Sequence, residues 1–170
     1  RTRLANFVAK GSAVWIAKAI RKVAPFAGKD ENRPILRGVC LRPENTGVGL
    51  WAADGYRVAR ALVFQPENMM AAIVAIPTAA MTKLAALLDE GGNVEIGPSL
   101  ALLDGDDSGR RGAASRVYFR GVSRDGVTWE AHLATLAGDY PPVWRFLPED
   151  KTFETNALVD TPKDDEETGE

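Results

Sequence analysis

Apolar residues recur with a helical period in two stretches of the chain. The first begins after Ser12 and runs to about Ala24, with apolar side chains on one face and basic ones opposite. Serine is a common cap at a helix start, and Pro25 and Gly28 mark the end. The second stretch, at 78–92, reads TAAMTKLAALLDEGG and ends at a pair of glycines. The pattern predicts two amphipathic helices.

Short runs rich in Val, Leu and aromatic residues surround these helices and predict β-strands. The runs lie at 4–11, 35–43, 48–53, 56–64, 71–77, 93–97, 116–123 and 127–136. Between the third and fourth runs stands Asp54-Gly55. We expect this pair to form a two-residue turn of the primed type, because such turns need positive φ.

The order of these elements repeats along the chain. A strand, a helix and about three strands occur in 4–64 and again in 71–136. Two such units predict an α+β fold in which both helices pack on one face of curved antiparallel sheets. We expect a single domain over residues 1–150. Residues 151–170 are acidic and lack apolar periodicity, which predicts a disordered C-terminal tail.

Charge is distributed unevenly along the chain, although the net value is only −2. Residues 1–60 hold 12 Lys and Arg against 4 Asp and Glu, whereas residues 149–170 hold 2 against 9. A basic first part indicates an anionic partner. The single cysteine, Cys40, lies among apolar residues and is typical of a reducing compartment. No apolar run is long enough to span a membrane, so we expect a cytoplasmic protein without membrane contacts.

The residues give little support for catalysis. His132 is the only histidine, and no Asp, Ser or Cys stands at a spacing that indicates a triad. The chain has no Cys and His cluster with zinc spacing and no phosphate-binding GxxxxGK motif. A small hydrolase that uses Asp54 and His132 is the enzymatic alternative. We expect no enzymatic activity, no cofactor and no metal.

Four blocks of sequence resemble a known family. RPILRGVCL, LWAADGYRVA, VAIPTAAMTKLAALL and LAGDYPPVWRFLP follow the order and spacing of the middle domain of the bacterial DNA polymerase III beta subunit, the sliding clamp. The resemblance covers about residues 4–150. It implies a clamp fold: six similar domains form a ring, helices line its hole, and sheets form its outside. It also implies a non-catalytic protein that tethers polymerase and repair proteins to DNA.

The resemblance further implies a share in a pocket for a short linear peptide of a partner protein. The residues carried over are Leu36, Ala53, Asp54, Gly55, Tyr56, Arg57, Val58, Pro141, Arg145 and Phe146. Such a groove needs an apolar floor and a few polar groups to orient the peptide. The family commonly has Thr and His where this chain has Ala53 and Tyr56. The alternative is that these residues complete the core beside a hairpin.

A second expected surface is a basic face that contacts double-stranded DNA without reading its sequence. Its residues are Lys10, Lys18, Arg21, Lys22, Lys29, Arg33 and Lys83. These side chains would neutralise phosphates, which is what a sliding tether requires. An ordinary solvated face is the alternative. Trp15, on the same side, would either stack on a base or pack against a neighbouring subunit, and the sequence favours the second.

These observations predict a single-domain clamp homologue that acts as a processivity or docking platform in DNA replication or repair. About six copies would be needed to close a ring of six domains, so we expect a homo-oligomer. The rival hypothesis is a clamp-fold interaction module that binds partner peptides, or a full-length clamp, without encircling DNA.

Overall fold

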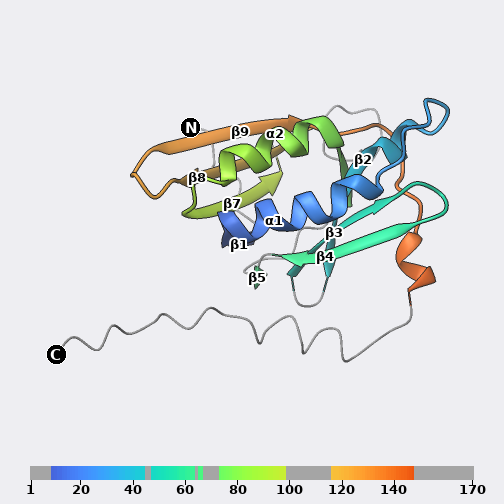
Figure 1. Cartoon of the computed structure of the whole chain (residues 1–170), viewed down its shortest axis with the longest axis horizontal. Helices are drawn as coiled ribbons and strands as arrows, with labels where there is room; N and C mark the ends of the chain where they lie inside the picture. The colour runs from blue at the N-terminus through green and yellow to red at the C-terminus, as the bar shows by residue number, and fades with distance from the viewer. Residues whose placement is uncertain (1–8, 45–46, 64, 67–72, 99–115, 148–170) are drawn as a thin grey trace, which may run out of the picture.

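The computed structural model describes residues 9–44, 47–63, 65–66, 73–98 and 116–147, and the expected tail at 151–170 lies outside them (Figure 1). The strands are β1 (Ala9–Ser12), β2 (Gly38–Glu44), β3 (Gly47–Ala53), β4 (Val58–Val63), β5 (Gln65–Pro66), β6 (Val74–Pro77), β7 (Asn93–Pro98), β8 (Arg116–Val122) and β9 (Thr128–Ala134). The helices are α1 (Ala13–Val23) and α2 (Thr78–Leu88), with short 3-10 helices η1 (Ala24–Phe26), η2 (Pro34–Arg37) and η4 (Val143–Phe146).

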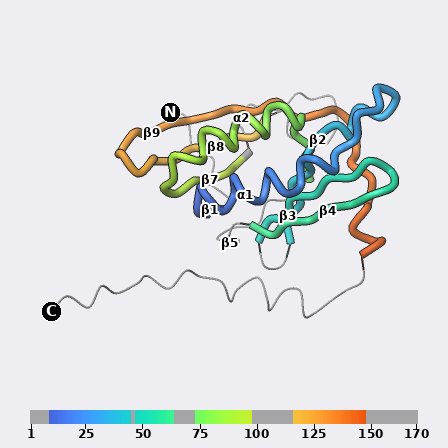
Figure 2. The backbone as a smooth tube through the Cα atoms, viewed as in Figure 1, coloured from blue at the N-terminus to red at the C-terminus, as the bar shows by residue number. Residues whose placement is uncertain are grey.

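The predicted repeat is present, and its two units are interlocked. The first unit is β1, α1, β2, β3 and β4, and the second is β6, α2, β7, β8 and β9. The two antiparallel sheets run β5-β1-β7-β8-β9 and β4-β3-β2-β6. The first strand of each unit therefore pairs in the sheet of the other unit, with Ala9 opposite Ile96 and Ile76 opposite Val39. Figure 2 shows the first of these exchanges, with β1 beside β7.

The main core lies between the two helices and both sheets. In Figure 1 α1 and α2 lie side by side in front of the strands, and the two helices are in contact. Ile16, Ile20 and Val23 of α1 are buried, as are Leu84 and Leu88 of α2. Burial of each large aliphatic side chain contributes about 1.5–3 kcal/mol. The helical periodicity of the sequence thus marks the faces that pack on the sheets.

A second, smaller core covers the opposite face of the sheet that contains β2 and β3. Because side chains alternate along a strand, Val39 and Leu41 face the helices while Cys40 faces away from them. The outer cluster comprises Leu36, Cys40, Trp51, Ala53, Ala75, Tyr140 and Val143. Tyr140 and Val143 come from the C-terminal segment, which crosses this face. Burial raises the pKa of the Cys40 thiol to about 12, so the thiol stays neutral.

The structure confirms the expected order of elements and corrects the starts of two strands, one of which, β4, begins at Val58 and not at residue 56. Residues 4–8, 64 and 71–72 of the expected strands lie outside the described residues. Residues 35–37 were expected to begin the second strand, but they lie in η2, and β2 starts at Gly38. Pro34 explains the difference, because its ring fixes φ and suits the first turn of a helix. Gly38 then lets β2 approach β6 closely, since a Cβ there would lie 2.8 Å from the Ile76 carbonyl oxygen. The pattern missed β5 and η4.

A buried carboxylate ties three strands together on the outer face. Glu44 is 7% exposed, and Trp51 Nε1 donates a hydrogen bond to its Oε1 at 2.8 Å. The Arg60 guanidinium donates to Oε2, and Arg42 Nη1 lies 3.5 Å from Oε1. Gly49 leaves the space for this group, because a Cβ at that position would overlap Glu44 Oε1.

We predict that Glu44→Ala destabilises the domain, because the substitution leaves the Arg60 charge and the Trp51 N–H without the carboxylate that they share. The free energy of unfolding should fall by about 3 kcal/mol, as for other broken buried ion pairs. Urea denaturation measures the change. Glu31→Ala is the matched control, because Glu31 is exposed and its loss should change the value by less than about 0.5 kcal/mol. Equal effects of the two substitutions would contradict the prediction.

Candidate functional site

The turn between β3 and β4 is built around the carboxylate of Asp54. Its Oδ1 accepts hydrogen bonds from the backbone N–H groups of Tyr56, at 2.9 Å, and Arg57, at 2.8 Å. The Arg57 Nε donates to Oδ2 at 2.9 Å. These donors, the two backbone groups first, lower the pKa of the Asp54 carboxyl below its usual value. Asp54 is therefore an ionised structural group of the turn.

The expected turn was placed one residue too early. The last paired residues are Ala53 and Val58, and Asp54 N donates to the Arg57 carbonyl at 3.2 Å. The central residues are consequently Gly55, with φ of 94°, and Tyr56. Asp54 is the first residue of the turn, and its side chain accepts the backbone hydrogen bonds of the residues that follow Gly55.

This turn projects an aromatic side chain into solvent. Tyr56 is 97% exposed. The guanidinium of Arg57 lies 5.4 Å from the centre of the Phe26 ring, a cation–π distance. Val58 is half-buried against the outer cluster, and Ala53 is buried within it. Two of the turn's expected pocket residues thus belong to the core, whereas Tyr56 is available to a ligand.

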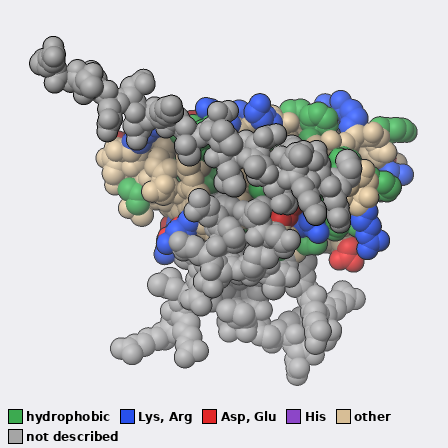
Figure 3. Space-filling view, turned by 90° about the horizontal axis from the view of Figure 1, so that it is seen from below, with side chains coloured by type: hydrophobic (Ala, Val, Ile, Leu, Met, Phe, Trp, Pro, Cys, Tyr) green, Lys and Arg blue, Asp and Glu red, His purple; other side chains and the backbone are tan. Residues whose placement is uncertain are grey.

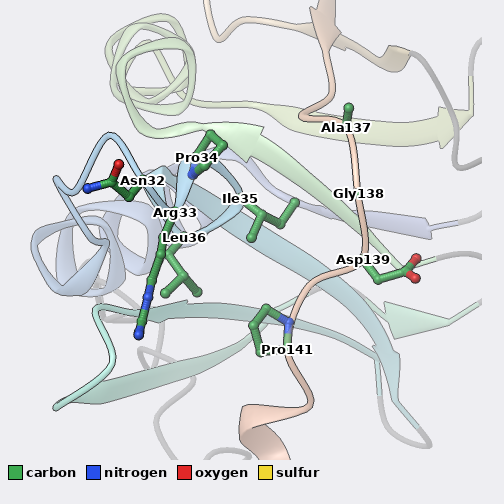
Figure 4. A pocket seen from close by; sticks show the side chains of 9 residues that line it. All are labelled: Asn32, Arg33, Pro34, Ile35, Leu36, Ala137, Gly138, Asp139 and Pro141. Atoms are coloured by element: carbon green, nitrogen blue, oxygen red, sulfur yellow. The ribbon is translucent and has the colours of Figure 1, made fainter.

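A pocket of about 390 Å³ lies beside this turn (Figure 4). Its lining residues are Asn32, Arg33, Pro34, Ile35, Leu36, Ala137, Gly138, Asp139 and Pro141. In Figure 4 the two lining segments face each other across the pocket, one leading into β2 and the other running toward η4. Of the expected peptide-binding residues, Leu36 and Pro141 line it. Arg145 and Phe146 lie in η4 outside this lining, and Phe146 is 81% exposed.

Backbone contacts hold the pocket against the turn. The Gly28 N–H donates to the Leu36 carbonyl at 2.8 Å and to the Ala53 carbonyl at 3.1 Å. A Cβ on Gly55 would lie 3.1 Å from Arg33 Nη1, so the Arg33 side chain extends to the turn. Arg33 was expected on the DNA-binding face, and the structure places it at the pocket. The sequence analysis did not identify the other lining residues, although these residues are close to Leu36 and Pro141 in the sequence.

The outer face of α1 carries a basic row. Lys18 and Lys22 are exposed on it, and Lys29 is exposed in the loop that follows η1. On α2, Lys83 is exposed. Lys10 is on β1, where its Nζ lies 3.7 Å from Glu95 Oε1. In Figure 3, Lys and Arg side chains occur along the upper edge of the described surface, among apolar ones.

Like Lys10, Arg21 of the expected basic face is already paired with a carboxylate. Arg21 Nη1 donates to Asp89 Oδ1 at 2.7 Å, and the second nitrogen contacts the other carboxylate oxygen. This hydrogen-bonded guanidinium lowers the pKa of the Asp89 carboxyl, which stays ionised at neutral pH. Glu90 adds a second exposed acid beside it. The face is consequently less basic than the sequence suggests, and Lys18 and Lys22 carry most of its charge on α1.

Other chemistry finds little support in the described part of the chain. Among those residues no cluster of three or more His, Cys, Asp or Glu side chains is placed to hold a metal ion. None of the described helices is long and apolar enough to cross a membrane. His132 lies on β9 with its ring 4.6 Å from that of Tyr118, whereas Asp54 belongs to the turn in the other sheet. These two residues do not form the hydrolase pair considered from the sequence.

Comparison with known proteins gives consistent matches. A family model described as the central domain of the DNA polymerase III beta subunit matches residues 12–108. A beta sliding clamp of Streptomyces coelicolor is 29% identical over 147 residues, which are 85% of this chain and 35% of that protein. This chain therefore spans about a third of the length of that relative.

Solved structures agree on the fold. The DNA polymerase III beta chain of Streptococcus pneumoniae is 21% identical with a TM-score of 0.63, over 88% of this chain and 35% of that one. The sliding clamp of Bacillus subtilis is 22% identical with a TM-score of 0.60, over 87% and 36%. A clamp of Bartonella birtlesii bound to griselimycin is 22% identical with a TM-score of 0.60, over 88% and 37%. Because the family model matches more than half of the chain, this protein belongs to the DNA polymerase III beta subunit family and corresponds to its central domain.

Proposed function

We propose that this chain is a single-domain sliding-clamp homologue, with its domain at 1–150 and an acidic tail at 151–170, that encircles DNA as a homo-oligomer. It acts as a non-catalytic platform to which a polymerase or repair protein docks. One observation carries the proposal: the paired helices α1 and α2 leave the outer face of α1 uncovered, and this face presents Lys18 and Lys22. The family membership and the name of the Streptomyces coelicolor relative support it.

The basic row fits a sliding contact. Lysine ammonium groups attract phosphates as point charges and read no base sequence. Each neutralised phosphate adds about 0.9 to the slope of log affinity against log salt. Two or three such contacts give weak, salt-sensitive binding. A tether that must move along DNA needs this kind of binding.

We predict that Lys22→Glu weakens retention of the full chain on closed circular DNA at moderate salt. The reversal replaces attraction to a phosphate by repulsion, and the salt slope should fall by about 1. Arg116→Glu is the control with the same change in charge. Arg116 is exposed on β8, and side chains alternate along a strand, so it faces away from the core that the neighbouring Val117 enters. Closed circles should also retain the wild-type chain better than linear DNA with free ends. Equal loss of retention in both variants would contradict a specific contact of Lys22 with DNA. Equal retention on closed and linear DNA would contradict encirclement.

Sheet edges provide a route to assembly. Within the described residues, β4 and β9 each pair with a strand on one side only. An edge strand presents unpaired N–H and C=O groups that another chain can pair with. The proposed ring joins such edges between copies, and about six copies restore six domains.

We therefore expect native mass spectrometry and light scattering to find a closed oligomer of about six chains. The mass should stay constant as concentration rises, because a closed ring leaves no free edge to extend. A monomer at high concentration, or a mass that grows without limit, would contradict the ring. A monomer that still binds clamp ligands would favour an interaction module that does not encircle DNA.

The second candidate function is an interaction module that binds partner peptides without encircling DNA. The pocket of about 390 Å³ favours it, because Leu36, Ile35 and Pro141 supply an apolar lining, and Arg33 and Asp139 supply polar groups. Tyr56 and Phe146 stand exposed on nearby elements of the same outer face. Aromatic side chains of this kind often dominate binding energy at interfaces.

The Bartonella birtlesii clamp binds griselimycin, and we propose this compound as a probe of the pocket and its two exposed aromatic residues. We predict that the double variant Tyr56→Ala and Phe146→Ala weakens griselimycin binding by about tenfold or more in calorimetry. Both side chains are exposed, so the fold should be retained. Val127→Ala, at an exposed apolar position of the other hairpin, is the control. Unchanged affinity in the double variant would remove these residues from the ligand site.

A further inference from the structure

Trp15 is a large aromatic residue left 48% exposed on the helix that carries the basic row. It precedes Lys18 by three positions and Lys22 by seven, and residues at these spacings lie on one face of a helix. Trp15, Lys18 and Lys22 together extend over about 10 Å along the helix axis. An aromatic ring and two ammonium groups thus stand in line on an uncovered surface.

The position of Lys18 decides which partner suits Trp15. The Lys18 Nζ lies 5.0 Å from the centre of the Trp15 ring, a cation–π contact. A protein surface packed on this ring would have to desolvate the ammonium group, and a buried charge without a counterion is costly. A nucleic-acid strand offers a base for the ring and a phosphate for the ammonium group together. The contact therefore disfavours packing of this ring against an apolar surface of a neighbouring subunit.

We propose that an unpaired base of a single strand displaces the Lys18 ammonium group from the Trp15 ring and stacks there, while Lys18 and Lys22 hold neighbouring phosphates. This inference rests on the proposed association with DNA and extends it to a preference for single-stranded segments. Bases inside a duplex are stacked on one another, so they offer no free face to the ring. Stacking is tolerant of sequence because every base has a π-face. Trp15, Lys18 and Lys22 would therefore bind an unpaired strand without recognising its base sequence.

The test measures binding of the full chain to a labelled oligothymidylate and to a duplex of the same length, over a range of salt concentrations. Trp15→Ala should weaken binding to the single strand by about tenfold, with the duplex affinity and both salt slopes unchanged. Trp15→Phe should keep much of the single-strand affinity, because a smaller aromatic ring still stacks. Lys22→Ala should weaken both complexes and lower the single-strand salt slope by about 0.7.

Two outcomes would overturn the inference alone. In the first, the wild-type chain binds duplex DNA and Trp15→Ala leaves the affinity for the single strand unchanged. The other is a lower native mass of Trp15→Ala, which would place the ring between subunits. Failure of the wild-type chain to bind either nucleic acid would instead overturn the proposed function and this inference together. Unfolding curves of both Trp15 variants exclude loss of the fold as the cause.

Discussion

The exchange of first strands between the two units is the constraint on which the rest of the structure depends. Because β1 pairs with β7 and β6 pairs with β2, each sheet is completed by the other half of the chain. Neither unit buries its helix alone, since the main core draws on both helices and both sheets. The same exchange brings α1 and α2 together on one face. A basic surface is thereby exposed on a helix that packs against both sheets.

The pocket arises from the same pairing, at the opposite face. Beyond β9 the chain continues to Leu136, whose N–H donates to the Ala75 carbonyl of β6 at 2.8 Å. From there it crosses the outer face, where Tyr140 and Val143 cover Cys40 and Trp51. The crossing sets residues 137–141 against residues 32–36. A pocket thus forms where the C-terminal segment passes the loop before β2.

Electrostatics divide the basic residues by role. Arg21 and Arg57 each pair with a nearby carboxylate. Arg21 does so across the contact between α1 and the end of α2, and Arg57 within the β3–β4 turn. Such exposed pairs contribute little to stability, but they neutralise basic side chains that a count of Lys and Arg in the first 60 residues includes. None of the described ion pairs includes Lys18 or Lys22. The charge of the first 60 residues therefore overstates the charge that the helix face presents.

Local patterns determined the elements of this protein, and the tertiary structure decided their use. The helical period of 13–23, the alternation of the strands and the repeated order of elements are local properties, so the sequence predicted both helices and the α+β class. The exchange of β1 and β6 depends on pairing between distant residues, and no local period encodes it. For the same reason only the structure could show that Asp89 pairs with Arg21 and that Arg33 reaches the pocket. Asp54 illustrates both contributions. The Asp-Gly pair predicted a turn from local sequence alone. Only the structure showed that the Asp54 carboxylate accepts the backbone hydrogen bonds, so that Gly55 and Tyr56 form the centre of the turn.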